Sequence, residues 1–137
     1  MEIKIGMKYT GKSLITDEMI RGFADSTGDK NPIHLDQVYA EKTFFKNRIA
    51  HGMLIGGLIS AILGNEFPGQ GTIYISQSMN FIAPVFIKDV ITVEVEIAGF
   101  TAKNWVELRT DCFNQNGKMV IKGNAVVIPP KHFVLLS

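Results

Sequence analysis

The stretch "MLIGGLISAIL", residues 53–63, is the longest apolar run in the chain, and it decides how the rest can fold. Its 11 residues fall well short of the roughly 20 that a helix needs to cross a membrane. The run therefore predicts a buried helix, from Gly52 to Asn65. Because this segment is apolar almost all round, we expect the protein to enclose it. Gly52 and Gly56 are small enough to allow close packing against a sheet.

Downstream of this helix, the hydrophobic pattern changes from the period of a helix to that of a strand. Four segments rich in β-branched residues predict strands: "TIYISQSMNFIAPV", "DVITVEVEIAGF", "NWVELRTDCFNQ" and "GKMVIKGNAVVIPP". Asn116-Gly117 predicts a hairpin between the last two. Pro129-Pro130 marks the expected end of the last strand.

Upstream of the central helix, "MEIKIGMKYTGK" alternates like a strand, and "TDEMIRGFADSTG" has the pattern of an amphipathic helix. Thr16 is the expected N-cap of that helix and Gly28 its end. "HLDQVYAEKTF" then predicts another helical turn or two. This order of elements predicts an α+β fold: one domain over residues 1–137, with an antiparallel sheet wrapped around the central helix and a helical excursion before it.

The composition excludes several classes of function. Fourteen Lys and Arg balance 13 Asp and Glu, giving a net charge of +1 without a basic stripe, so we expect no nucleic-acid partner. The apolar run is too short for a membrane anchor. The N-terminus lacks the features of a signal peptide, so we expect the mature protein to start there. The single cysteine, Cys112, excludes an internal disulfide and favours a cytoplasmic location.

The stretch "FADSTGDKNPIHLDQVYA" places a carboxylate, an amide and an imidazole around one proline. Asn31-Pro32 fixes a stiff turn, so Asp29 and His34 flank the bend and can converge on one water molecule as an acid and a base. A second interpretation is structural: Asp29 and Asn31 close the turn by bonding to backbone amides, and His34 caps the next helix. The stretch alone leaves both open, and the structural one is common at helix ends.

Three motifs occur in order: "FADSTGDKNPIHLD", "AHGMLIGGLISAILG" and "GTIYISQSMNFIAPVFIKDVITVEVEI". With them, the chain closely resembles the R-specific enoyl-CoA hydratases of the MaoC-like family over nearly its whole length. The resemblance implies a hot-dog fold whose helical overhang carries the active-site turn. It also implies reversible hydration of trans-2-enoyl-CoA to (R)-3-hydroxyacyl-CoA, with no cofactor and no metal. A homodimer with the acyl-CoA thioester near its interface is expected.

The same resemblance implies roles for individual residues. Asp29 and His34 match the catalytic dyad of the family, and Asn31 matches the Asn of the same turn. The amide of Gly52 should bind the thioester carbonyl oxygen. The chemistry needs these parts, because water must lose a proton to attack C3 and the enolate-like oxygen must be stabilised by a fixed N–H. We assign the proton transfers to the dyad jointly.

Three further residues have side chains that can take part in chemistry. His51 can be a catalytic imidazole, but beside a buried helix it is more often structural, packing or bonding to backbone. Ser60 lies eight residues after Gly52, where its hydroxyl can bond to a catalytic group, line the acyl site or bond to its own helix. Cys112 has no base partner in the sequence and is expected in the core.

Rival functions remain at this point. A hot-dog thioesterase, or the acyl-carrier-protein dehydratase of fatty-acid synthesis, is expected to carry a carboxylate on the central helix, and residues 52–65 contain no Asp or Glu. A MaoC-like dehydratase acting on carrier-protein thioesters would have the same sequence features as a CoA enzyme. The non-enzymatic alternative is an acyl-CoA-binding module that has kept the fold.

Overall fold

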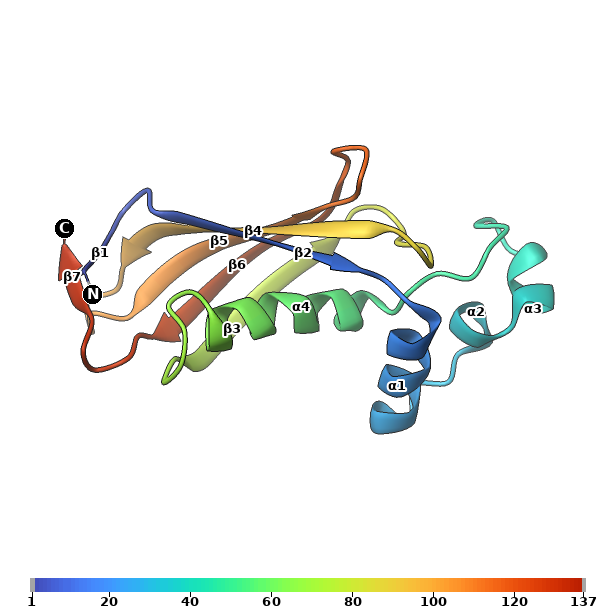
Figure 1. Ribbon diagram of the computed structural model, residues 1–137, viewed down its shortest axis with the longest axis horizontal. Helices are drawn as coiled ribbons and strands as arrows, with labels where there is room; N and C mark the ends of the chain where they lie inside the picture. Colours follow the sequence, from blue (N-terminus) through green and yellow to red (C-terminus); the bar gives the residue numbers. More distant parts are fainter. Residues whose placement is uncertain (1, 137) are drawn as a thin grey trace.

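The computed structural model describes residues 2–136, and a curved antiparallel sheet is its main element (Figure 1). The sheet has five strands in the order β2-β4-β5-β6-β3. The bounds of these strands are β2 Lys8–Leu14, β3 Ile73–Phe81, β4 Val90–Phe100, β5 Val106–Phe113 and β6 Met119–Ile128. The four strands predicted after the central helix are therefore confirmed. Gly117 has a φ of 76° in the turn between β5 and β6, as the predicted hairpin requires.

The two ends of the chain differ from the prediction. The N-terminal segment, predicted as one strand, is broken at Gly6, whose φ of 94° favours glycine. Only β2 joins the main sheet, while the short strand β1, Glu2–Lys4, pairs in parallel with β7, Val134–Leu136. The strand β6 ends at Ile128, directly before Pro129-Pro130 as predicted, but a further short strand, β7, follows it and was not predicted.

The central helix, α4 (Gly52–Asn65), packs against the concave face of the sheet (Figure 1). Ile55, Ile59 and Leu63 are buried on its sheet side. They meet the inward-facing apolar residues of β4, whose side chains alternate between buried and partly exposed along the strand. Burial of such side chains contributes about 1.5–3 kcal/mol each.

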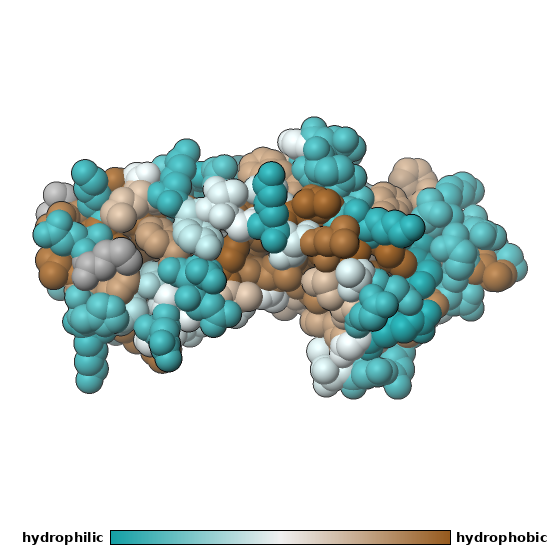
Figure 2. All heavy atoms as spheres, viewed as in Figure 1, coloured by the Kyte–Doolittle hydropathy of each residue, from teal (hydrophilic) through white to brown (hydrophobic). Residues whose placement is uncertain are grey.

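The expectation that α4 would be enclosed all round was wrong for the single chain. The side chain of Met53 is 58% exposed, and Gly57, Ser60 and Ala61 are also exposed. The physical reason is that one sheet covers one face of a helix. The opposite apolar face of α4 is left open. In the space-filling view, apolar atoms also reach the surface in the middle of the molecule, between hydrophilic side chains (Figure 2).

Three helices form an overhang at one end of the sheet, opposite the end where β1 and β7 lie (Figure 1). Their bounds are α1 Asp17–Thr27, α2 Pro32–Leu35 and α3 Gln37–Glu41. Thr16 caps α1, as predicted, because its side chain accepts a hydrogen bond from the Met19 amide at 3.2 Å. The predicted helical overhang is therefore confirmed. Within the described residues, no helix is long and apolar enough to cross a membrane.

Candidate functional site

The turn between α1 and α2 is held by local bonds. Gly28 ends α1 with a φ of 82°, and its amide donates to the Ala24 carbonyl at 2.8 Å. The Asn31 side chain accepts from the Ile33 amide at 3.2 Å and so caps α2, with Pro32 as the first helical residue. The structural interpretation thus holds for Asn31. It does not hold for His34 as a helix cap, because Asp36 caps α3.

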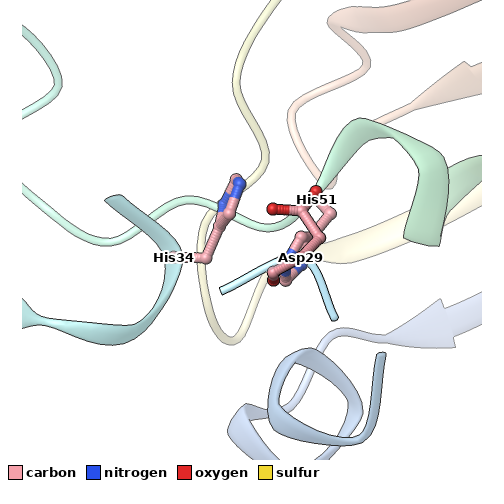
Figure 3. A group of neighbouring side chains, drawn as sticks. All are labelled: Asp29, His34 and His51. Atoms are coloured by element: carbon pink, nitrogen blue, oxygen red, sulfur yellow. The ribbon is translucent and has the colours of Figure 1, made fainter. Parts of the chain in front are cut away.

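This turn brings Asp29 and His34 together, as predicted, and adds His51. One side-chain atom from each of the three residues lies within 4.8 Å of the others. Asp29 comes from the loop after α1, His34 from α2, and His51 from the residue before α4 (Figure 3). The Asp29 side chain is exposed and that of His34 is half-buried, so the cluster is open to a ligand on the Asp29 side.

The orientation of the His34 ring is fixed by one short hydrogen bond. Its Nδ1 lies 2.7 Å from the carbonyl oxygen of Ile49. A carbonyl oxygen only accepts, so Nδ1 carries the proton and Nε2 of the neutral ring is left as a proton acceptor. Burial lowers the pKa of His34, and the neighbouring His51 adds to this effect. The Ile49 carbonyl and Asp29 oppose it, and the net pKa is below the ordinary histidine value.

His51 bonds to backbone, which confirms the structural interpretation of that residue. The ring is 2% exposed, and its Nε2 lies 2.9 Å from the carbonyl oxygen of Asp29. By the same reasoning, Nε2 donates its proton to that oxygen. The ring also stacks on His34, with ring centroids 3.8 Å apart, and packs against the Phe23 ring, with centroids 4.7 Å apart. His51 therefore fixes the backbone of Asp29 and supports the His34 ring.

The arrangement of the two imidazoles suits proton transfer better than metal binding. Each ring uses one nitrogen on a backbone carbonyl. The rings are stacked with an angle of 27° between their planes, and the lone pair of an imidazole lies in its ring plane. The remaining lone pairs of His34 and His51 therefore lie in the planes of two rings that face each other, whereas tetrahedral coordination of a metal such as zinc needs lone pairs directed at one point.

Gly52 is the first residue of α4, directly after His51. The first amides of a helix have no partner within the helix, and the helix dipole adds partial positive charge there. A larger side chain at this position would also meet a neighbouring ring. A Cβ built on Gly52 would lie 2.6 Å from Cε1 of Phe81. The Gly52 amide therefore lies at the start of α4, directly after His51.

An open groove runs along α4 from this helix start. It has a volume of about 350 Å³ and lies between the exposed face of α4 and strand β3. Its lining is mostly apolar, and includes Met53, Gly56 and Met79. Ser60 lines the same groove. It lies about 12 Å from Gly52 along the helix axis, since an α-helix rises 1.5 Å per residue. Ser60 is therefore placed in the groove and away from the Asp29–His34 pair.

Arg48 is a residue of this site that the sequence did not reveal. Its Nε donates to the carbonyl oxygen of His34 at 2.7 Å, and its Nη2 pairs with the carboxylate of Asp17. The side chain of Arg48 is only 11% exposed. In the sequence it is one of 14 basic residues, and nothing in "FKNRIAHG" sets it apart except its position just before the His51-Gly52 pair.

The fold and this cluster define the class of the protein: a hot-dog domain with a helical overhang that carries an Asp–His turn. The profile of the family described as "MaoC like domain" matches residues 2–113, and the chain belongs to this family.

Relatives with closely similar sequences and structures agree with this assignment. The (R)-specific enoyl-CoA hydratase of Rhodospirillum rubrum is 45% identical over 94% of this chain and 90% of its own. The 3-hydroxybutyryl-CoA dehydratase of Methylorubrum extorquens is 42% identical over 95% of this chain and 83% of its own. The unliganded structure of R-hydratase PhaJ1 from Pseudomonas aeruginosa superposes with a TM-score of 0.91 at 44% identity, covering 95% of this chain and 84% of that one.

Proposed function

We propose that this chain is an R-specific enoyl-CoA hydratase, a hydro-lyase that adds water to trans-2-enoyl-CoA to give (R)-3-hydroxyacyl-CoA. The observation that carries the proposal is the Asp29–His34 pair, in which the Nδ1–H···O bond to Ile49 leaves Nε2 of His34 free to accept a proton. The names of the two relatives described above support the same activity. We infer that the whole chain, residues 1–137, forms this hydratase domain.

In the proposed mechanism, one water molecule lies between the Asp29 carboxylate and Nε2 of His34. One of these two basic groups takes a proton from the water as its oxygen bonds to C3. The double bond becomes an enolate, whose negative oxygen is held by the Gly52 amide at the start of α4. A proton from the pair then adds to C2, so that the pair returns to its starting state. Because the water is held on one face of the planar enoyl group, one hand of product forms.

The acyl-CoA thioester is the proposed substrate because the groove along α4 begins at Met53, the residue after Gly52. With the carbonyl oxygen on the Gly52 amide, the hydrocarbon chain can extend along the apolar lining between α4 and β3. Ser60 and Gln77 lie further along this groove and are among its few polar side chains. Ser60 is therefore proposed to contact the acyl chain and not the reacting atoms.

The proposal extends to the assembly and its compartment. We infer a homodimer, because the exposed face of α4 and the groove lined by β3 are apolar surfaces that a second copy can cover. Cys112 is buried in the core, and burial raises the pKa of its thiol to about 12. An unreactive thiol of this kind is compatible with the proposed cytoplasmic location.

A hydration assay separates this proposal from two alternative functions. A dehydratase for carrier-protein thioesters would use the same residues, and a non-catalytic module would bind acyl-CoA without turning it over. The test is to measure hydration of crotonyl-CoA and of crotonyl carrier protein. Each product is then offered to an S-specific 3-hydroxyacyl-CoA dehydrogenase, the carrier-protein product after its acyl group has been transferred to CoA. We expect fast turnover of crotonyl-CoA and little formation of NADH by the dehydrogenase. Rapid NADH formation would contradict the R assignment.

The dyad is tested in the same assay with two variants. Asp29→Asn and His34→Ala are expected to lower kcat by roughly 10²–10⁴-fold, the range for general acid–base groups. Their thermal unfolding should be nearly unchanged, because Asp29 is exposed and His34 is half-buried. Wild-type activity in both variants would place the chemistry elsewhere.

A further inference from the structure

The α2 turn that carries His34 cannot hold its own shape. It has four residues, none of them buried, and isolated helices of this length are not stable in water. The last carbonyls of any helix lack partners within it, and the carbonyl of His34 is one of these. The position of His34 therefore depends on residues outside α2.

The segment Arg48-Ile49 supplies these contacts. The Ile49 amide donates to the Ile33 carbonyl at 3.3 Å, and the Ile49 carbonyl accepts from Nδ1 of His34 at 2.7 Å. The Nε of Arg48 donates to the His34 carbonyl at 2.7 Å. His34 is thus held at both its backbone and its ring by two adjacent residues. The backbone of this segment is fixed in turn by the Ala50 amide, which donates to the Val85 carbonyl at 2.7 Å.

Arg48 itself is fixed by α1. Its guanidinium pairs with Asp17, the first residue of α1, and Asp17 also accepts from Nε of Arg21 at 2.9 Å. The bond from Arg48, followed by that from Arg21, lowers the pKa of the Asp17 carboxyl, so that Asp17 is charged at neutral pH. Two residues of α1, Ile20 and Ala24, are buried. Arg48 therefore links the small α2 turn to a longer helix that is anchored in the core.

We propose that Arg48 is a positioning residue for His34. Its planar guanidinium bonds to the His34 carbonyl and to Asp17 at once, and so keeps the α2 turn where Nδ1 of His34 donates to Ile49 and the ring lies close to Asp29. Lysine cannot replace it, because a single ammonium group lacks the fork geometry that spans two acceptors in fixed directions. The kinetic consequence rests on the proposed hydratase function, whereas the ring orientation of His34 does not.

The experiment compares wild type with Arg48→Gln and Arg48→Lys. For Arg48→Gln, kcat for crotonyl-CoA should fall about 10–100-fold with KM nearly unchanged, because a misplaced catalytic group slows the reaction step more than substrate binding. Nitrogen-15 NMR spectra of the histidine rings report the tautomer directly, and the His34 signals are those missing in His34→Ala. Wild type should show the Nδ1–H tautomer for His34, and Arg48→Gln a mixture of both tautomers. Arg48→Lys should also lose the single tautomer.

Arg21→Gln is the matched control. Arg21 also pairs with Asp17, but its side chain is 53% exposed and does not contact His34, so this variant should keep the wild-type kcat and the wild-type His34 tautomer.

Three outcomes overturn the inference or separate it from the proposed function. Wild-type kcat in Arg48→Gln would overturn it, and so would a lowered kcat with an unchanged His34 tautomer, which indicates a role in stability alone. If Arg48→Gln does not fold, Arg48→Lys, which keeps the charge, decides by the same two readouts. If wild type does not hydrate crotonyl-CoA, the proposed function fails, and the tautomer comparison still tests the role of Arg48.

Discussion

At the scale of single residues, the site depends on which nitrogen of each histidine carries a proton. Each ring donates one N–H to a backbone carbonyl oxygen: His34 to Ile49 and His51 to Asp29. These bonds join a ring to a residue 15 or 22 positions away, so they tie the Asp29–His34 turn to the segment before α4. Nε2 of His34 is therefore the basic nitrogen because of the bond to Ile49, and not because of the turn alone.

The pH dependence of hydration follows from the lowered pKa of His34. Burial, with a smaller contribution from His51, holds this pKa below the ordinary histidine value of 6.5. The neutral ring is the active form in the proposed mechanism, so activity is lost when the pH falls through the lowered pKa. We therefore expect the acid limb of kcat/KM to lie below pH 6.5. Steady-state rates from acidic to neutral pH test this, with samples returned to pH 7 to exclude denaturation. An acid limb above the ordinary histidine value would contradict the prediction.

Substitution of Gly52 tests the helix start. In Gly52→Ala the new methyl group would lie 2.6 Å from the Phe81 ring, so the ring or the start of α4 must move. We expect kcat to fall about 10²-fold, the effect of losing one donor to a developing oxyanion. Gly64→Ala on the same helix is the control, because a Cβ there meets nothing within 4 Å. It should keep activity and stabilise the protein by roughly 0.5–1 kcal/mol. Equal activity of the two variants would argue against a role for the Gly52 amide.

At the scale of elements, the sequence was most informative where structure is set locally. The strands after Thr72 and the helix α4 follow from hydrophobic period and β-branched content, and both were predicted within a few residues. The parallel pair of β1 and β7 joins opposite ends of the chain, and a local sequence pattern does not predict such a pairing. The same holds for the site. The Asp29–His34 turn is local and was predicted, whereas the contact of Arg48 with His34 depends on how two segments pack.

The pairing of β4 with β5 creates one charged cluster on the outer face of the sheet. Arg109 bonds to Glu94 at 2.6 Å, to Glu96 at 2.8 Å and to Asp111 at 2.5 Å. The Asp111 side chain is only 5% exposed, and it also accepts from the Gly123 amide. Arg109 therefore bonds to three carboxylates, one of which is buried.

Removal of Arg109 should destabilise this part of the sheet in a pH-dependent way. In Arg109→Met, Asp111 stays buried without its cation beside two other carboxylates, and we expect Tm at neutral pH to fall by roughly 5 °C. The bond from Arg109 lowers the pKa of Glu96, so this stabilisation is present at neutral pH and is lost as the pH falls through the lowered pKa. The difference in Tm should therefore shrink in acid. Lys122→Met, an exposed position on β6, is the control. A difference that grows in acid would contradict this account.

At the scale of the whole molecule, the two edges of the main sheet are unlike each other. The edge strand β2 carries Lys8 and Lys12, and charged side chains on an edge oppose pairing with another sheet. The other edge strand, β3 (IYISQSMNF), has no charged residue. Its end residues are exposed apolar side chains, with Ile73 55% and Phe81 54% exposed. The edge at β3 also borders the groove and the open face of α4.

These features select β3 as the edge that a second copy covers in the proposed homodimer. Antiparallel pairing of two β3 strands would continue the sheet and bring the open faces of both α4 helices together, which closes the groove beside Gly52. Sedimentation at micromolar concentration should therefore give twice the chain mass of 15.2 kDa. Ile73→Lys should shift the protein to monomer and lower the hydration rate, because the charge opposes edge pairing. Leu14→Lys, at a 54% exposed position on the β2 edge, should leave both unchanged. A fully active wild-type monomer would refute the dimer, and dissociation by Leu14→Lys alone would move the interface to β2.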